Sequence, residues 1–159
     1  MSEHWSDVHN LLGPLSYLLK ACDPDGVEFY WTIGDSTTIK YKTPAKMQAA
    51  VNEKQAHRLQ KTNISIRLGL VLETYRQKLL SRNYPLLERP MNIYILTDGI
   101  WADGGDAETP ITQMVEDLKR LGFRRRQVGI QFISFGNDSN ALRRLELLDL
   151  LGKRPGIGM

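Results

Sequence analysis

Asp98 and Thr62 are the two residues of this sequence with the strongest case for binding chemistry. Asp98 follows the apolar segment 91–97 and precedes a glycine, so its carboxylate is expected at the carboxyl edge of a sheet, where α/β proteins bind ligands. A carboxylate there suits a hard cation such as Mg²⁺, which prefers oxygen ligands. Asp-Gly is also a common turn sequence, so a purely turn-forming role for Asp98 stays open.

Thr62 lies in a polar loop directly before the apolar stripe of residues 64–79. A hydroxyl at this position is typical of a helix N-cap, and capping alone would explain the residue. A hydroxyl oxygen has more than one lone pair, so capping and cation binding are compatible roles. Together, Thr62 and Asp98 predict an oxygen-lined cation site if the fold brings them to one edge.

The other polar clusters fit local structural roles better than a second site. The acids of 103–108 lack EF-hand spacing, the histidines lack metal-ligand spacing, and the cysteine has no neighbouring histidine to activate it. Three consecutive arginines before a strand predict a solvated connector, and two acids flank a turn proline. These residues are Asp103, Asp106, Glu108, Arg124, Arg125, Arg126, His4, His9, His57, Cys22, Asp23 and Asp25. No nucleophile elbow, P-loop or dinucleotide-binding glycine pattern is present in the sequence.

Alternating strand and helix patterns must position these candidates. Strand patterns lie at residues 27–32, 37–41, 91–97 and 128–135, and helix patterns at 5–19, 44–56, 64–79, 110–121 and 138–151. Pro14 predicts a kink or a restart of the first helix, and Thr43 and Thr109 each precede a proline as N-caps do. Strands separated by helices predict an α/β fold whose mostly parallel sheet has helices on both faces.

Composition fits one soluble globular domain. The 159 residues are 42% hydrophobic and 25% charged, and no apolar run is long enough to cross a membrane. The net charge of +3 is too small to indicate nucleic acid without a concentrated basic patch, and we expect neither nucleic acid nor a membrane as partner. A single cysteine, and first residues unlike a secretory signal, favour an intracellular and cytoplasmic location.

The order of several landmarks resembles a known family. They are His4-Trp5 before the first helix, residues 23–26 before an aromatic strand, Thr62, Ile95-Leu96-Thr97-Asp98-Gly99, and residues 130–138. Over residues 1–150 this order resembles a von Willebrand factor A domain of the intracellular subgroup common in fungal proteins. The resemblance implies a doubly wound, Rossmann-like sheet with a metal-ion-dependent adhesion site. There, three loops hold Mg²⁺, and a partner protein's carboxylate often completes the coordination.

The chain departs from the family pattern at both ends. Thr62 matches the threonine of the second loop and Asp98 the aspartate of the third, but the Asp-x-Ser-x-Ser motif of the first loop is absent. Met1 matches the methionine after that motif, and Ser2 and Ser6 are expected on or beside the first helix. The family's first, central strand and its last strand are also missing. We therefore expect an incomplete domain at 1–152 and a disordered tail at 153–159.

The resulting functional expectation is a protein-interaction module that is not an enzyme. Thr62 and Asp98 supply two of the six oxygens that Mg²⁺ prefers, so any Mg²⁺ should bind weakly. The expected partner is a protein that offers a carboxylate. The alternatives are a metal-free interaction domain or non-autonomous fragment, with self-association through exposed sheet edges, and an Mg²⁺-dependent phosphohydrolase with Asp98 as a metal ligand.

Overall fold

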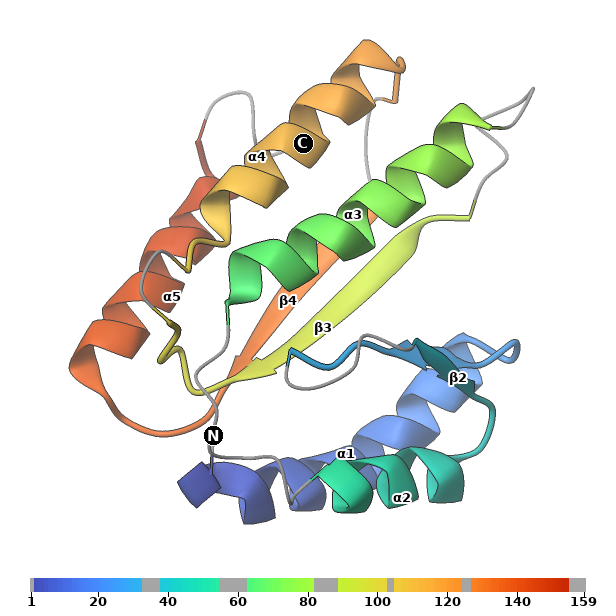
Figure 1. The fold of residues 1–159 in the computed structure, drawn as a ribbon, viewed down its shortest axis with the longest axis vertical. Coiled ribbons are helices and arrows are strands. Elements are labelled where there is room, and N and C mark those ends of the chain that lie inside the picture. The colour runs from blue at the N-terminus through green and yellow to red at the C-terminus, as the bar shows by residue number, and fades with distance from the viewer. Residues whose placement is uncertain are drawn as a thin grey trace. The chain divides into compact units, whose positions relative to one another are not determined.

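The computed structural model describes residues 2–32, 38–54, 63–81, 89–102, 105–123 and 127–154, and its class is mixed α/β. The chain divides into two compact units, Met1–Thr62 and Asn63–Met159 (Figure 1). The first contains η1 (Ser2–His4), α1 (Trp5–Cys22), β1 (Val27–Phe29), β2 (Ile39–Tyr41) and α2 (Pro44–Lys54). The second contains α3 (Ile64–Leu80), β3 (Met91–Thr97), α4 (Glu108–Arg120), β4 (Val128–Ser134) and α5 (Ser139–Leu151). None of the described helices combines the length and the apolar character needed to span a bilayer.

Each helix of the first unit buries the residues of one face. In α1 the buried residues are Trp5, Val8, Leu12 and Ser16, which recur at helical spacing, and the helix continues through Pro14 without a restart. In α2 they are Met47, Ala50 and Val51. The hydroxyl oxygen of Thr43 accepts a hydrogen bond from Lys46 N at 3.4 Å, which confirms the predicted N-cap.

The strands of the first unit pair antiparallel, with Val27 opposite Tyr41 and Phe29 opposite Ile39. The sequence predicts a longer strand to residue 32, but β1 ends at Phe29. The segment between Phe29 and Ile39 is shorter than the dozen or so residues of a parallel crossover, which explains the antiparallel pairing. The turn before β1 forms as predicted, because an Asp23 carboxylate oxygen accepts from Asp25 N at 3.2 Å.

The second unit contains a parallel βαβ unit. β3 and β4 pair in register over their full length, from Met91 opposite Val128 to Thr97 opposite Ser134, and α4 connects them. Alternate strand residues pack against a buried cluster to which α3 and α4 contribute most of the side chains, and α5 adds Leu145 and Leu148. Figure 1 shows α3 and α4 lying side by side over the β3–β4 pair. This packing places the carboxyl ends of β3 and β4 at one edge of the unit.

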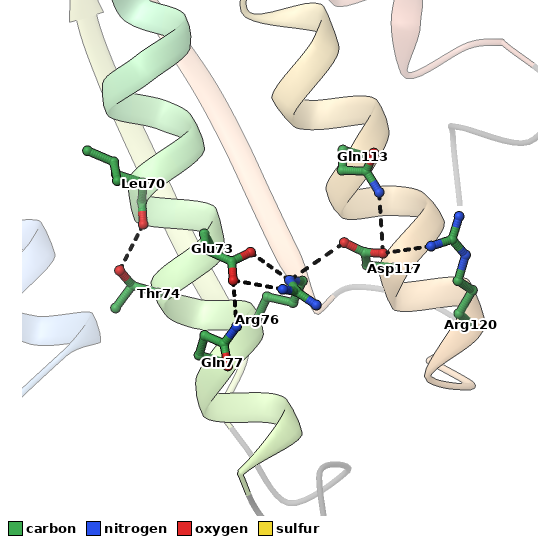
Figure 2. A network of polar contacts seen from close by, with 8 residues as sticks. All are labelled: Leu70, Glu73, Thr74, Arg76, Gln77, Gln113, Asp117 and Arg120. Atoms are coloured by element: carbon green, nitrogen blue, oxygen red, sulfur yellow. Dashed lines mark hydrogen bonds and ion pairs between the residues drawn. The ribbon is translucent and has the colours of Figure 1, made fainter.

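A polar network joins α3 to α4 on the surface of this unit (Figure 2). Arg76 on α3 donates from Nε to a Glu73 carboxylate oxygen at 2.6 Å and lies 3.8 Å from an Asp117 carboxylate oxygen on α4. Hydrogen bonds from Arg76 and Gln77 lower the pKa of Glu73 to about 2. Because these side chains are partly exposed, the network contributes little to stability.

Candidate functional site

Asp98 lies at the carboxyl end of β3, as the sequence predicts. The ladder closes one residue earlier, where Phe135 N donates to the carbonyl of Thr97 at 2.9 Å. Asp98 is 9% exposed, and its Oδ1 accepts a hydrogen bond from Ile100 N at 3.0 Å. The turn-forming role is therefore confirmed. A carboxylate can accept several hydrogen bonds or bind a cation as well, so the predicted ligand role is compatible with this turn.

The backbone around Asp98 is fixed by the residue before it. The buried hydroxyl oxygen of Thr97 accepts from Gly99 N and from Trp101 Nε1, both at 3.0 Å. One side chain thus ties together the start and the end of the segment 97–101, which we call the Thr97–Trp101 loop. The loop holds Asp98 in a defined conformation before any ligand binds, which lowers the entropic cost of forming a site.

Gly99 brings the Thr97–Trp101 loop against the first turn of α5. Its φ of +72° lies in the left-handed region that favours glycine. A Cβ built there would lie 2.7 Å from the Cβ of Ala141 and 3.2 Å from the carbonyl oxygen of the same residue. Asp138 is the N-cap of α5, because its carboxylate oxygen accepts from Ala141 N at 2.8 Å. A glycine after Asp98 is therefore required by backbone conformation and by contact.

Arg144 on α5 makes a long-range contact with the loop. Its Nη1 donates to the carbonyl oxygen of Gly99 at 2.7 Å, and its guanidinium carbon lies 5.1 Å from the ring centroid of Trp101. The Trp101 ring lies in turn 6.3 Å from that of Phe132 on β4. Sequence reasoning missed Arg144, since nothing in local spacing links a helical arginine to a loop 45 residues earlier.

Thr62, the second predicted ligand, lies outside the described residues. Its predicted capping role belongs instead to Asn63, whose side-chain oxygen accepts from Ile66 N at 3.3 Å. The side chain one residue closer to α3 is the one that reaches the third helical N–H, which is the usual N-cap geometry. The predicted convergence of Thr62 with Asp98 stays a prediction.

In the described part of the acidic loop at 103–108, Asp106 contacts the start of α4. Asp103 lies outside the described residues. The Asp106 carboxylate accepts from Glu108 N at 2.7 Å and from Thr109 N at 3.1 Å. A further hydrogen bond from the Thr109 hydroxyl contributes most to lowering the pKa of Asp106. The predicted capping role of Thr109 is therefore wrong: α4 begins at Glu108 with Ala107 at the N-cap position, and the Asp106 carboxylate accepts from the first two N–H groups of the helix. Glu108 accepts from Arg154 Nη1 at 2.6 Å.

The remaining weak candidates form no cluster in the described part of the chain. Nδ1 of His4 lies 3.7 Å from an Asp7 carboxylate oxygen, His9 is partly exposed, and Cys22 is exposed. No three His, Cys, Asp or Glu side chains among the described residues are grouped so as to hold a metal ion. His57 and the arginines at 124–126 lie outside those residues.

Comparison with known proteins gave no match to a protein-family model, to a curated protein or to a solved structure. A buried carboxylate ends a parallel strand, a backbone N–H holds one of its oxygens, and its loop is hydrogen-bonded to the next helix.

Proposed function

We propose that this chain is an intracellular, cytoplasmic protein-interaction module of the von Willebrand factor A type, with Thr62 and Asp98 as a partial metal-ion-dependent adhesion site. The proposed fold is a doubly wound, Rossmann-like arrangement with helices on both faces of the sheet. The observation that carries the proposal is the place of Asp98, at the carboxyl end of a parallel strand in a hydrogen-bonded turn. Ligands of α/β sheets bind at this edge.

The proposed mechanism is a cation bridge. Asp98 and Thr62 would supply hard oxygen ligands, which fit Mg²⁺ in kind, although two oxygens leave most of its octahedral shell to water. A carboxylate of the partner protein would replace part of that water. With few protein ligands the cation should bind weakly to the chain alone, and we expect neither catalysis nor binding to nucleic acid or membranes.

Substitution of Asp98 separates its two roles. Asp98→Asn keeps an oxygen that can accept from Ile100 N, whereas Asp98→Ala removes it. We expect Mn²⁺ to broaden the NMR signals of Gly99 and Ile100 in the wild-type chain and in neither variant. Asp98→Ala should also lower the free energy of unfolding by about 1–2 kcal/mol, with little change in Asp98→Asn.

Two control variants make the result specific. Asp149→Asn removes an exposed acid that pairs with Lys153, so the Mn²⁺ effect at Gly99 should survive it. Thr62→Val removes a hydroxyl at nearly constant volume and should weaken the effect. Broadening that persists in Asp98→Asn would contradict the cation site. Tight binding at micromolar Mg²⁺ would contradict a site built from two protein oxygens.

A second candidate function is metal-free association of two copies through strand edges. It is favoured by the composition of β3 and β4, which contain neither charged residues nor proline. Such residues usually protect exposed strand edges from pairing with another chain. In the described residues the sheet of the second unit has these two strands. Sedimentation should then show a concentration-dependent dimer, weakened by Tyr94→Lys on the exposed strand face. A monomer at all concentrations would contradict this candidate.

A further inference from the structure

One peptide group connects Arg144 to Asp98. The carbonyl of Gly99 accepts from Arg144 Nη1 at 2.7 Å, and the N–H of the same peptide, which belongs to Ile100, donates to Asp98 Oδ1 at 3.0 Å. Because a peptide group is planar, fixing its carbonyl direction also fixes the direction of its N–H. The charged donor further polarises the peptide and strengthens the hydrogen bond that Ile100 N makes.

We propose that Arg144 is a positioning residue for Asp98, acting through the Gly99–Ile100 peptide to hold the carboxylate in its present orientation. Its importance for cation capture rests on the proposed function. The positioning itself does not, because the contacts that join the Arg144 guanidinium, the Gly99–Ile100 peptide and the Asp98 carboxylate are part of the fold. The functional consequence is that α5 becomes a support for the Asp98 turn, and a change at Arg144 alters the site without touching a ligand.

The geometry requires an arginine rather than any cation. The guanidinium lies over the Trp101 ring at 5.1 Å while one of its nitrogens donates to Gly99, so one flat group makes both contacts. A lysine carries the same charge as a single compact ammonium and cannot stack and donate in this way. Trp101 is itself held by the hydrogen bond from Nε1 to Thr97 Oγ1, which fixes the surface that the guanidinium covers.

Arg143 provides a matched control. It is the adjacent arginine on α5 and, like Arg144, is exposed. Arg143→Ala therefore changes net charge and helix propensity as Arg144→Ala does, but leaves the contact with Gly99 in place. Arg144→Lys restores the charge without the stacked geometry, so it separates electrostatic attraction from positioning.

The test is hydrogen exchange by NMR on the full chain. Arg144→Ala should speed exchange at Ile100 N–H by at least about tenfold, because the turn opens more often when a charge-assisted hydrogen bond is lost. Arg144→Lys should behave similarly, and Arg143→Ala should match the wild type. The Ile95 amide in the middle of β3 serves as an internal standard and should not change. Equal acceleration at Ile95 and Ile100, or none at Ile100, would overturn the proposal.

Mn²⁺ titration of the same variants separates this inference from the proposed function. If Arg144 positions the acid for a cation, Arg144→Ala should weaken Mn²⁺ broadening at Gly99 while Arg143→Ala retains it. Undiminished broadening in Arg144→Ala would overturn the role of Arg144 in the site and leave the proposed function standing. Faster exchange at Ile100 in a chain that binds no Mn²⁺ even as wild type would support the positioning and contradict the cation site.

Discussion

Different kinds of polar contact lie at the two ends of the β3–β4 pair. At the amino end, Tyr75 on α3 donates its hydroxyl to the carbonyl of Arg89 at 2.7 Å, and the Gln127 amide donates to that hydroxyl. At the carboxyl end, the hydroxyl oxygen of Thr97 accepts from Gly99 N, and Asp98 Oδ1 accepts from Ile100 N. The amino end thus joins neutral groups, whereas the carboxyl end encloses an acid.

This difference makes the amino end a structural polar cluster and the carboxyl end a candidate site. Neutral donors and acceptors that satisfy one another fix where the strands begin and leave no charge to compensate. A carboxylate that is nine-tenths buried is costly to ionise unless donors or a cation stabilise it. A buried acid at a strand end is therefore stronger support for binding than an equally buried tyrosine or glutamine.

The largest effect should come from adding one methyl group to the carboxyl end. Gly99→Ala combines a positive φ with a Cβ 2.7 Å from Ala141, so the loop or α5 must shift. We expect a loss of about 2–4 kcal/mol in the free energy of unfolding, from backbone strain plus overpacking. Urea unfolding measures the loss, and the Mn²⁺ effect at residue 100 should disappear with it.

Gly122 is the matched control for this substitution. Its φ of +82° is similar, but a Cβ there meets nothing within 4 Å. Gly122→Ala should therefore cost only the strained backbone, about 1–2 kcal/mol. Equal losses in the two variants would show that the contact between the loop and α5 is looser than described.

At the amino end, Tyr75→Phe should have the next largest effect. It removes the hydroxyl that donates to Arg89 and accepts from Gln127, a side chain that is itself buried. Leaving the buried Gln127 amide with one fewer hydrogen bond should cost about 1–3 kcal/mol. Urea unfolding measures the loss, while Mn²⁺ broadening at Gly99 should be unchanged, because the two ends are separate networks.

Tyr17→Phe controls for removal of a hydroxyl as such. Tyr17 is 67% exposed on α1, so the substitution should change the free energy of unfolding by less than about 0.5 kcal/mol. If Tyr75→Phe were equally mild, the amino-end contacts would not be structural, and the contrast between the two ends would weaken.

Much of this architecture could be predicted because its causes are local. The helical stripe Leu68, Leu72, Tyr75 and Leu79 and the apolar run of β3 are patterns of burial along a single element. Capping by Asp138 and the stop at Gly122 likewise depend on neighbours in sequence. The position of Asp98 follows from the strand that precedes it.

The rest depends on choices that local patterns do not settle. Asn63 and Thr62 are both capping residues, as are Asp106 and Thr109, and only the path of the chain decides which side chain reaches the helix. The contact of Arg144 with Gly99 depends on how α5 packs on the loop, which no periodicity encodes. Sequence therefore predicts which acid ends the strand, but not what holds that acid in place.

The smallest predicted effect concerns Glu73. This acid is partly exposed, and hydrogen bonds stabilise its ionised form. Arg76 and Gln77 lower its pKa from 4.5 to about 2 in the folded chain. A lowered folded pKa means that the stabilisation is complete above pH 4.5 and is lost as the pH falls toward 2. Glu73→Gln should therefore cost a few tenths of a kcal/mol at pH 7 and almost nothing near pH 2.

A double-mutant cycle with Arg76→Gln isolates this pair. The coupling between positions 73 and 76 should be about 0.3–0.5 kcal/mol at pH 7 in low salt, and should shrink in 1 M salt because exposed charges are screened. Urea unfolding of the four chains at pH 7 and pH 2.5 measures it. A coupling that is independent of pH would mean that hydrogen-bond geometry, rather than the charge of Glu73, joins the pair.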